Sequence, residues 1–204
     1  MLAAGFSVVL AFVSSAGLAV GGDSPGMAMT TPSRAAARDV GFETVSGAPV
    51  WSIPAVGATT TVQLGLRITN RSDQALRFTN FDTLVPALRD AHGRSIAIDG
   101  GRNRTLPPDV KNCPLLAPGE SQVFHLDAKL YWHGGILRLG GTDGFGGLWY
   151  FSGLVPGLYE LRMGYRQMHQ QLTLGTPAAR ALRGFWIAEA AGSWVTVTID
   201  DPQP

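Results

Sequence analysis

The chain has 204 residues, with 16 basic and 15 acidic side chains and a single cysteine. This near-neutral balance excludes the basic footprint of a nucleic-acid-binding domain. One cysteine excludes an internal disulfide and a zinc site built on Cys-x-x-Cys pairs.

The chain begins with an expected export leader and a linker. Residues 1–19 carry no charge, contain an apolar run and end in small side chains, which is typical of a signal peptide cleaved after Ala19. At about 20 residues the stretch is also long enough to stay as a membrane anchor, so we expect membrane contact only if it is uncleaved. Residues 20–38, rich in Gly, Ser, Pro and Ala, predict a flexible linker. We expect one domain at 39–204 in a secreted or periplasmic protein.

From residue 60 onward the sequence has the alternation of β-strands. Apolar side chains recur at every second position in 60–69 and in 158–166, at Val62, Leu64, Leu66 and Ile68 and at Tyr159, Leu161, Met163 and Tyr165. Strict alternation predicts strands with one buried face. Further strands are predicted at 76–79, 84–88, 95–98, 121–129 and 193–200.

Helical signals are sparse, and Pro-Gly turns separate the strands. Residues 178–182 and 187–191 each predict about one helical turn. Pro118-Gly119 suits the centre of a type II turn, and Pro156-Gly157 marks a second turn. The sequence therefore predicts an all-β fold, an antiparallel β-sandwich with long loop insertions.

Three segments carry a resemblance to known sandwich families. Residues 154–159, Leu-Val-Pro-Gly-Leu-Tyr, resemble the tyrosine corner of immunoglobulin-like and fibronectin-type domains. The resemblance implies that the Tyr159 ring lies in the core and that its hydroxyl bonds the backbone just upstream. With 68–73 and 116–121, the pattern is similar to bacterial extracytoplasmic Ig-like domains and to the BsuPI-type proteinase-inhibitor domain. Inhibition through an exposed loop at 99–108 or 140–147 is therefore a candidate activity.

Ionisable residues in the sequence do not assemble into a recognised catalytic motif. His125 and Asp127 share a strand face, but a metal site needs three or four ligands, so we predict surface polar residues and neither a metal nor a cofactor. Asp143 lies in a glycine-rich stretch that lacks the spaced carboxylates of a calcium loop. Cys113 is predicted to be a half-buried thiol, with a bridge to another chain as the alternative.

The segment 130–151 combines several glycines with aromatic side chains. One interpretation is a binding loop in which Trp132, Trp149 and Tyr150 contact a ligand; the other is that the aromatic residues pack the core. Trp186 and Trp194 are expected to pack. We expect a non-catalytic exported binding or structural module whose partner is an extracytoplasmic protein or glycan. A proteinase inhibitor and a carbohydrate-binding domain are the alternatives.

Overall fold

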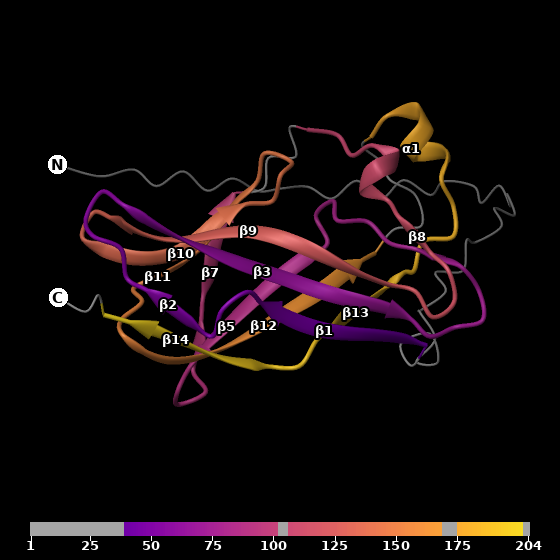
Figure 1. Cartoon of the computed structure of the whole chain (residues 1–204). Coiled ribbons are helices and arrows are strands. Elements are labelled where there is room, and N and C mark those ends of the chain that lie inside the picture. The colour runs from indigo at the N-terminus through magenta and orange to yellow at the C-terminus, as the bar shows by residue number, and fades with distance from the viewer. Residues whose placement is uncertain (1–38, 102–105, 169–174, 202–204) are drawn as a thin grey trace, which may run out of the picture. The chain divides into compact units, whose positions relative to one another are not determined.

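The computed structural model describes residues 39–101, 106–168 and 175–201 (Figure 1). The predicted signal peptide (1–19) and linker (20–38) lie outside the described residues. The strands in chain order are β1 (Val40–Ser46), β2 (Val50–Ser52), β3 (Thr59–Asn70), β4 (Leu76–Arg77), β5 (Leu84–Asp90), β6 (Ser95–Ile96), β7 (Ile98–Gly101), β8 (Leu115–Leu116), β9 (Ser121–His133), β10 (Ile136–Thr142), β11 (Leu148–Ser152), β12 (Gly157–Gln167), β13 (Ala188–Ala191) and β14 (Val195–Asp200). In these ranges the helical elements are a 3-10 turn (Val110–Asn112) and α1 (Pro177–Ala181), close to the predicted turn at 178–182. No helix in the described ranges has the length and apolar character to cross a membrane.

Most strands belong to two sheets that share one core. Sheet A has the strand order β1-β3-β9-β10-β11-β7. Sheet B has the order β2-β14-β12-β5-β6, and β13 also pairs with β12. The short strands β4 and β8 form a separate pair. The predicted all-β sandwich is confirmed.

The core consists of the side chains that alternate inward from both sheets. Leu64 in β3 lies opposite Leu126 in β9, and both are buried. From sheet B, Leu161 in β12 is fully buried in the same cluster. Burying an aliphatic side chain of this size contributes roughly 1.5–3 kcal/mol. The alternation in the sequence therefore identifies the inward face of each sheet.

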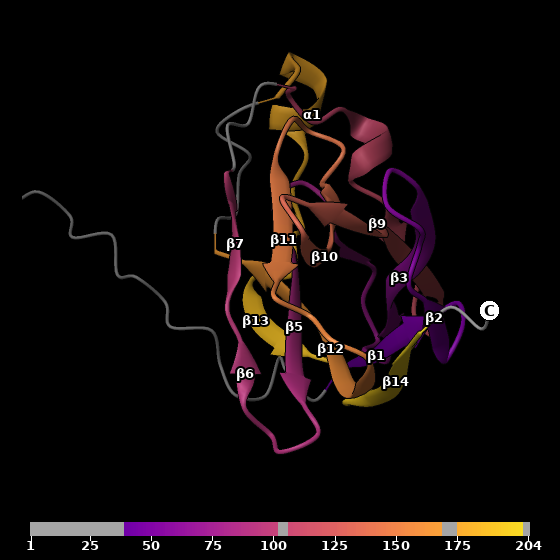
Figure 2. The same ribbon diagram turned by 90° about the vertical axis from the view of Figure 1, so that its left-hand side faces the viewer.

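The chain crosses between the sheets at both sides of the sandwich. β1 belongs to sheet A, and after three residues the chain enters sheet B as β2, which runs parallel to β14. This pair departs from the predicted antiparallel arrangement, because the short connection does not reverse the chain. On the other side β7 follows β6 after one residue and joins sheet A (Figure 2).

Two predicted elements are wrong. Residues 187–191 were expected to form a helical turn, but Ala188–Ala191 form β13, because the edge of β12 offers a partner over Gly164–Gln167. The expected loop at 130–151 is mostly strand: it holds the end of β9, all of β10 and most of β11.

The loop prediction for 130–151 is wrong because glycines in this segment, Gly140 and Gly141, lie within a strand. A Cβ atom at Gly140 would clash with the backbone of Trp149, and one at Gly141 would clash with the backbone of Asp127. These two glycines therefore allow close backbone approach within a sheet.

Candidate functional site

The structure separates the three residues predicted to bind a ligand. Trp149 and Tyr150 are adjacent in β11, so their side chains point to opposite faces of sheet A. Trp149 is 4% exposed and contacts Phe151 in the core, with 6.0 Å between the ring centroids. Trp132 packs against the core and donates its indole N–H to the Pro54 carbonyl at 2.8 Å. The packing interpretation therefore fits both tryptophans, and Tyr150 is the one of the three that lies on the outer face.

Tyr150 is held in place on the outer face by two side chains from other strands. Its hydroxyl donates a hydrogen bond to Asp99 Oδ2 at 3.0 Å. The Arg138 guanidinium carbon lies 4.4 Å from the centroid of the Tyr150 ring, a cation–π arrangement. Arg138 is itself fixed, because its Nε donates to Ser152 Oγ at 3.1 Å.

The contact between Tyr150 and Asp99 changes the pKa of both groups. The hydrogen bond to Asp99, with some burial, raises the pKa of the Tyr150 hydroxyl. The pKa of Asp99 is lowered, first by the backbone N–H of Gly100 and then by the Tyr150 hydroxyl. The pair is therefore a carboxylate and a neutral phenol at neutral pH.

A second tyrosine–cation pair lies beside the first. Tyr131 in β9 is directly opposite Arg138 in β10, and Lys129 Nζ lies 5.6 Å from the Tyr131 ring centroid. Gly140 is opposite both Lys129 and Tyr150, so no side chain separates the two pairs at that position. We call the five residues that form this surface the tyrosine face: Asp99, Lys129, Tyr131, Arg138 and Tyr150.

A shallow hollow continues this surface along β3 and β9. It has a volume of about 340 Å³, and the outward side chains around it are those of Thr61, Gln63, His125 and Asp127. His125 and Asp127 do share one face, as the sequence predicts. In the described ranges, no three His, Cys, Asp or Glu side chains lie close enough together to hold a metal ion.

Asp143 closes the turn between β10 and β11. Its Oδ1 accepts hydrogen bonds from the backbone N–H groups of Phe145 and Gly147, each at 2.8 Å. Phe145 in the same turn is buried against Phe81, with 5.0 Å between the centroids and nearly perpendicular rings. The carboxylate is therefore occupied with the backbone of its own turn.

Cys113 is more deeply buried than predicted. Its side chain is fully buried in a small cluster with Ala179 and Phe185. Burial raises the pKa of the thiol, and a hydrogen bond with Thr79 partly opposes the shift. The thiol is therefore protonated and inaccessible in the folded chain.

Tyr159 makes the contact that its sequence context implies. Its ring is buried in the core, and its hydroxyl donates to the Val155 carbonyl oxygen at 3.0 Å. The Tyr159 hydroxyl oxygen in turn accepts a hydrogen bond from the Val155 backbone N–H at 3.1 Å. Tyr159 therefore ties the start of β12 to the turn that precedes it.

Trp194 has surroundings that the sequence did not reveal. It was expected to pack in the core, but it is half-buried on the outside of sheet B, just before β14. The guanidinium carbons of Arg89 and Arg162 lie 4.2 and 4.5 Å from its ring centroid. The alternation in the sequence of β12 predicts that Arg162 faces outward, but the sequence does not predict that Arg162 lies next to Trp194.

Comparisons with known proteins add little to this geometry. No family model matches the chain, and no curated protein matches it. One solved structure to which the chain is similar is a β-glucosidase from Listeria innocua in complex with gluconolactone. The similarity covers 79% of this chain and 16% of that chain, with 10% identity and a TM-score of 0.32. A likeness at this level carries no argument about the fold or activity of this chain.

Proposed function

We propose that the chain is a non-catalytic, immunoglobulin-like binding module that acts outside the cytoplasm. In this proposal, the tyrosine face docks an extracytoplasmic partner protein. The observation that carries the proposal is the Tyr150 ring held between Asp99 and Arg138 on the outer face of sheet A.

Two structural features support the immunoglobulin-like assignment. The Tyr159–Val155 contact has the form of a tyrosine corner. The first strand, β1, lies in sheet A, and β2, which follows it after three residues, pairs in parallel with the last strand, β14, in sheet B. In this interpretation, β10 and β11 are an inserted hairpin that extends sheet A and carries Arg138 and Tyr150.

The tyrosine face has the residue types that dominate protein-binding surfaces. Tyrosine and arginine are enriched among the residues that contribute most to binding energy, and tyrosine loses little conformational entropy on contact. Cations already lie near the rings of both Tyr131 and Tyr150. A partner would therefore contact ring edges, hydroxyls and guanidinium groups, which favours a protein over a sugar stacked flat on an aromatic ring.

In their described parts, the two segments considered for proteinase inhibition are strand residues paired within sheet A and a closed turn. Residues 99–101 belong to β7, and 140–142 belong to β10; residues 102–105 lie outside the described ranges. The turn at 143–147 is closed by the Asp143 carboxylate and anchored by buried Phe145. The resemblance to the BsuPI-type inhibitor domain stays a prediction, to be tested with a panel of serine, cysteine and metalloproteases.

Export depends on the predicted leader at 1–19. We expect the mature protein to begin after Ala19, which N-terminal sequencing of the exported chain would show. A mature chain that still starts at Met1 would instead indicate a retained anchor.

Site-specific photo-crosslinking tests the docking face. A benzoylphenylalanine in place of Tyr131 should form a discrete adduct in the native cell envelope, whereas the same group at Val56, which is 87% exposed in a loop, should not. The double change Arg138→Ala and Tyr150→Ser should abolish the adduct. Adducts of equal yield at both positions, or an adduct that survives the double change, would contradict the proposal.

A further inference from the structure

The outer face of sheet B has a hollow of its own. It has a volume of about 240 Å³ and lies over β5, β12 and β13. The floor of the hollow is formed mostly by small or short residues, which are Val85, Ala87, Gly164 and Ala191. Longer charged side chains surround this floor, namely those of Arg162, Arg166 and Glu189. Gly164 contributes to the depth, because it leaves the position opposite Val85 without a side chain.

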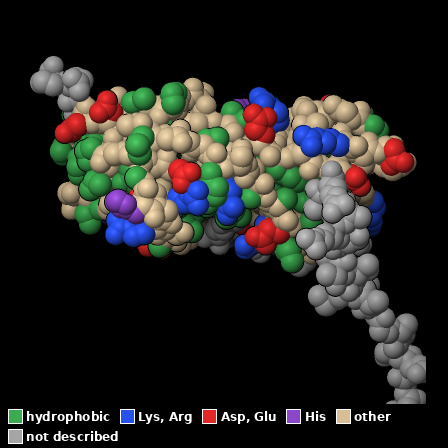
Figure 3. Space-filling view, turned by 90° about the horizontal axis from the view of Figure 1, so that it is seen from below, with side chains coloured by type: hydrophobic (Ala, Val, Ile, Leu, Met, Phe, Trp, Pro, Cys, Tyr) green, Lys and Arg blue, Asp and Glu red, His purple; other side chains and the backbone are tan. Residues whose placement is uncertain are grey.

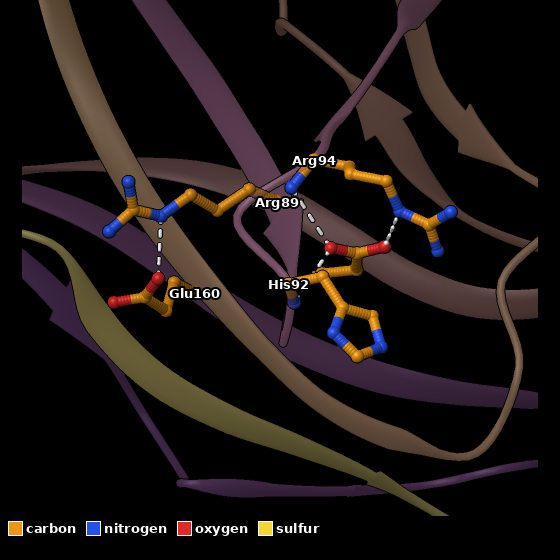
Figure 4. A network of polar contacts seen from close by, with 5 residues as sticks. Arg89, His92, Arg94 and Glu160 are labelled. Atoms are coloured by element: carbon orange, nitrogen blue, oxygen red, sulfur yellow. Dashed lines mark hydrogen bonds and ion pairs between the residues drawn. The ribbon is translucent and has the colours of Figure 1, made fainter.

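Three arginines on this face differ in their partners. Arg89 pairs with Glu160 at 2.5 Å, and the two side chains point toward each other (Figure 4). Arg166 makes a two-pronged contact with Glu189, with both N–O distances at 3.1 Å. Arg162 has no carboxylate partner in the described part of the chain, where its contact is with the ring of Trp194.

The surroundings of Arg162 hold its guanidinium next to the hollow. Trp194 contacts Arg162 and also Arg89, which is itself fixed by Glu160. Cation–π contacts of this kind restrict side-chain rotamers. A guanidinium that is already ordered loses less entropy when it binds a ligand.

The charges around this hollow are unequal. Arg89, Arg162 and Arg166 face Glu160 and Glu189, so three positive charges meet two negative charges and one positive charge is left over. Figure 3, which views the molecule from below Figure 1, shows basic and acidic side chains next to each other over the middle of this face. A ligand carboxylate bound at Arg162 would neutralise the remaining positive charge.

We propose that Arg162 and this hollow bind a glutamate or aspartate side chain of a partner protein. A guanidinium presents its donors as a fork that matches a carboxylate, and the apolar floor suits the methylene groups of an acidic side chain. The Trp194 ring already contacts two guanidinium groups, which makes it a poor platform for a sugar. This site lies on the sheet opposite the tyrosine face, so it goes beyond the proposed function and would let one module bridge two partners.

Peptide titration tests the proposal. A fluorescein-labelled hexaglutamate peptide is titrated with the full chain at low salt and followed by anisotropy. Arg162→Gln should weaken binding by about tenfold or more, as expected for a lost hydrogen-bonded charge pair. Arg94→Gln removes the same charge from an exposed turn (Figure 4) and should change affinity by less than about twofold. Arg162→Lys keeps the charge but not the fork, so its affinity should fall between those of the wild type and Arg162→Gln.

Each other result overturns the proposal. An equal loss of peptide affinity in Arg162→Gln and Arg94→Gln would show that the peptide is held by non-specific electrostatic attraction. Absence of binding by the wild type at millimolar peptide would show that no site exists. Tighter, Arg162-dependent binding of a hexagalacturonate would point to an acidic glycan instead. Near-UV circular dichroism checks that each variant is folded, and wild-type affinity in Arg162→Lys would exclude the forked contact.

Discussion

The backbone N–H of Met163 in β12 donates a hydrogen bond to the hydroxyl oxygen of Thr44 in β1, with 3.0 Å between the two atoms. Along one edge of β12, β13 pairs with Gly164–Gln167 and β14 pairs with Gly157–Leu161. Met163 lies in the gap between these two pairings, and the bond joins sheet B to sheet A there. Thr44 is a polar residue on the inward face of its strand, and its hydroxyl takes the place of a missing strand partner. Buried backbone donors are costly to leave unpaired, so this contact closes a gap in sheet B.

Replacing Thr44 with valine should destabilise the fold. Valine keeps the shape but removes the acceptor, so the Met163 N–H would be buried without a partner, at a cost of about 1–3 kcal/mol in the free energy of unfolding. Urea unfolding measures the change. Thr69→Val is the matched control, because Thr69 shares only an exposed bond with Ser121, and it should change stability by less than about 0.5 kcal/mol. Equal effects of the two changes would argue against the inter-sheet bond.

Gly192→Ala should also destabilise the protein. A Cβ atom at this position would lie 2.5 Å from the backbone nitrogen of Thr44, so β1 would have to move away from the segment that joins β13 to β14. Overpacking of this kind costs roughly 1–3 kcal/mol. At Gly164 the nearest atom to an added Cβ is 3.4 Å away, and Gly164→Ala should leave the melting temperature unchanged or slightly raised. A Gly192→Ala protein as stable as Gly164→Ala would contradict the close approach of β1.

Cys113 should not react in the folded protein. The thiol is fully buried and its pKa is raised by that burial, so both access and thiolate formation are suppressed. We expect no reaction with a disulfide reagent such as DTNB in native buffer and full reaction in guanidinium chloride. Stoichiometric labelling of the native chain, or a disulfide-linked dimer on a non-reducing gel, would show that the thiol is accessible.

The Asp99–Tyr150 contact should be visible in a pH titration. The pKa of Asp99 is lowered in the folded state, so the stability it contributes is fully present above its usual value of 3.8 and is lost as the pH falls through the lower folded value. Tyr150→Phe removes one of the two hydrogen bonds responsible and should raise the pKa of Asp99 toward the usual value. Carboxyl NMR titration measures this, with Tyr131→Phe as the control that leaves Asp99 unchanged. An Asp99 pKa unaffected by Tyr150→Phe would mean that the hydrogen bond is not formed.

Alternation in the sequence predicts the fold where one face of a strand is uniformly apolar, as in β3 and β12. β1 escaped prediction because polar Thr44 points inward and apolar Val45 does not, which breaks the pattern. The strands at 136–152 escaped because Gly140 and Gly141 resemble a loop in sequence. Their role, the close approach of neighbouring backbones, depends on tertiary structure.

The candidate site was only partly predictable for a similar reason. The aromatic composition of 130–151 identified Tyr150, but its hydrogen-bond partner Asp99 lies 51 residues away in the chain. Trp149 was grouped with Tyr150 because the loop interpretation ignored the alternation that puts the two on opposite faces. Trp194 depends on arginines from two other strands, a proximity that composition and spacing do not encode.

Oxidative footprinting of the wild-type chain, bound without a crosslink to the partner that crosslinking identifies, tests the docking face most directly. Hydroxyl radicals modify exposed tyrosine, so the proposal predicts that Tyr131 and Tyr150 become protected in the complex while Met168, an exposed residue outside the tyrosine face, is oxidised as in the free chain. Unchanged oxidation of both tyrosines in a saturated complex would contradict a partner bound to the outer face of sheet A.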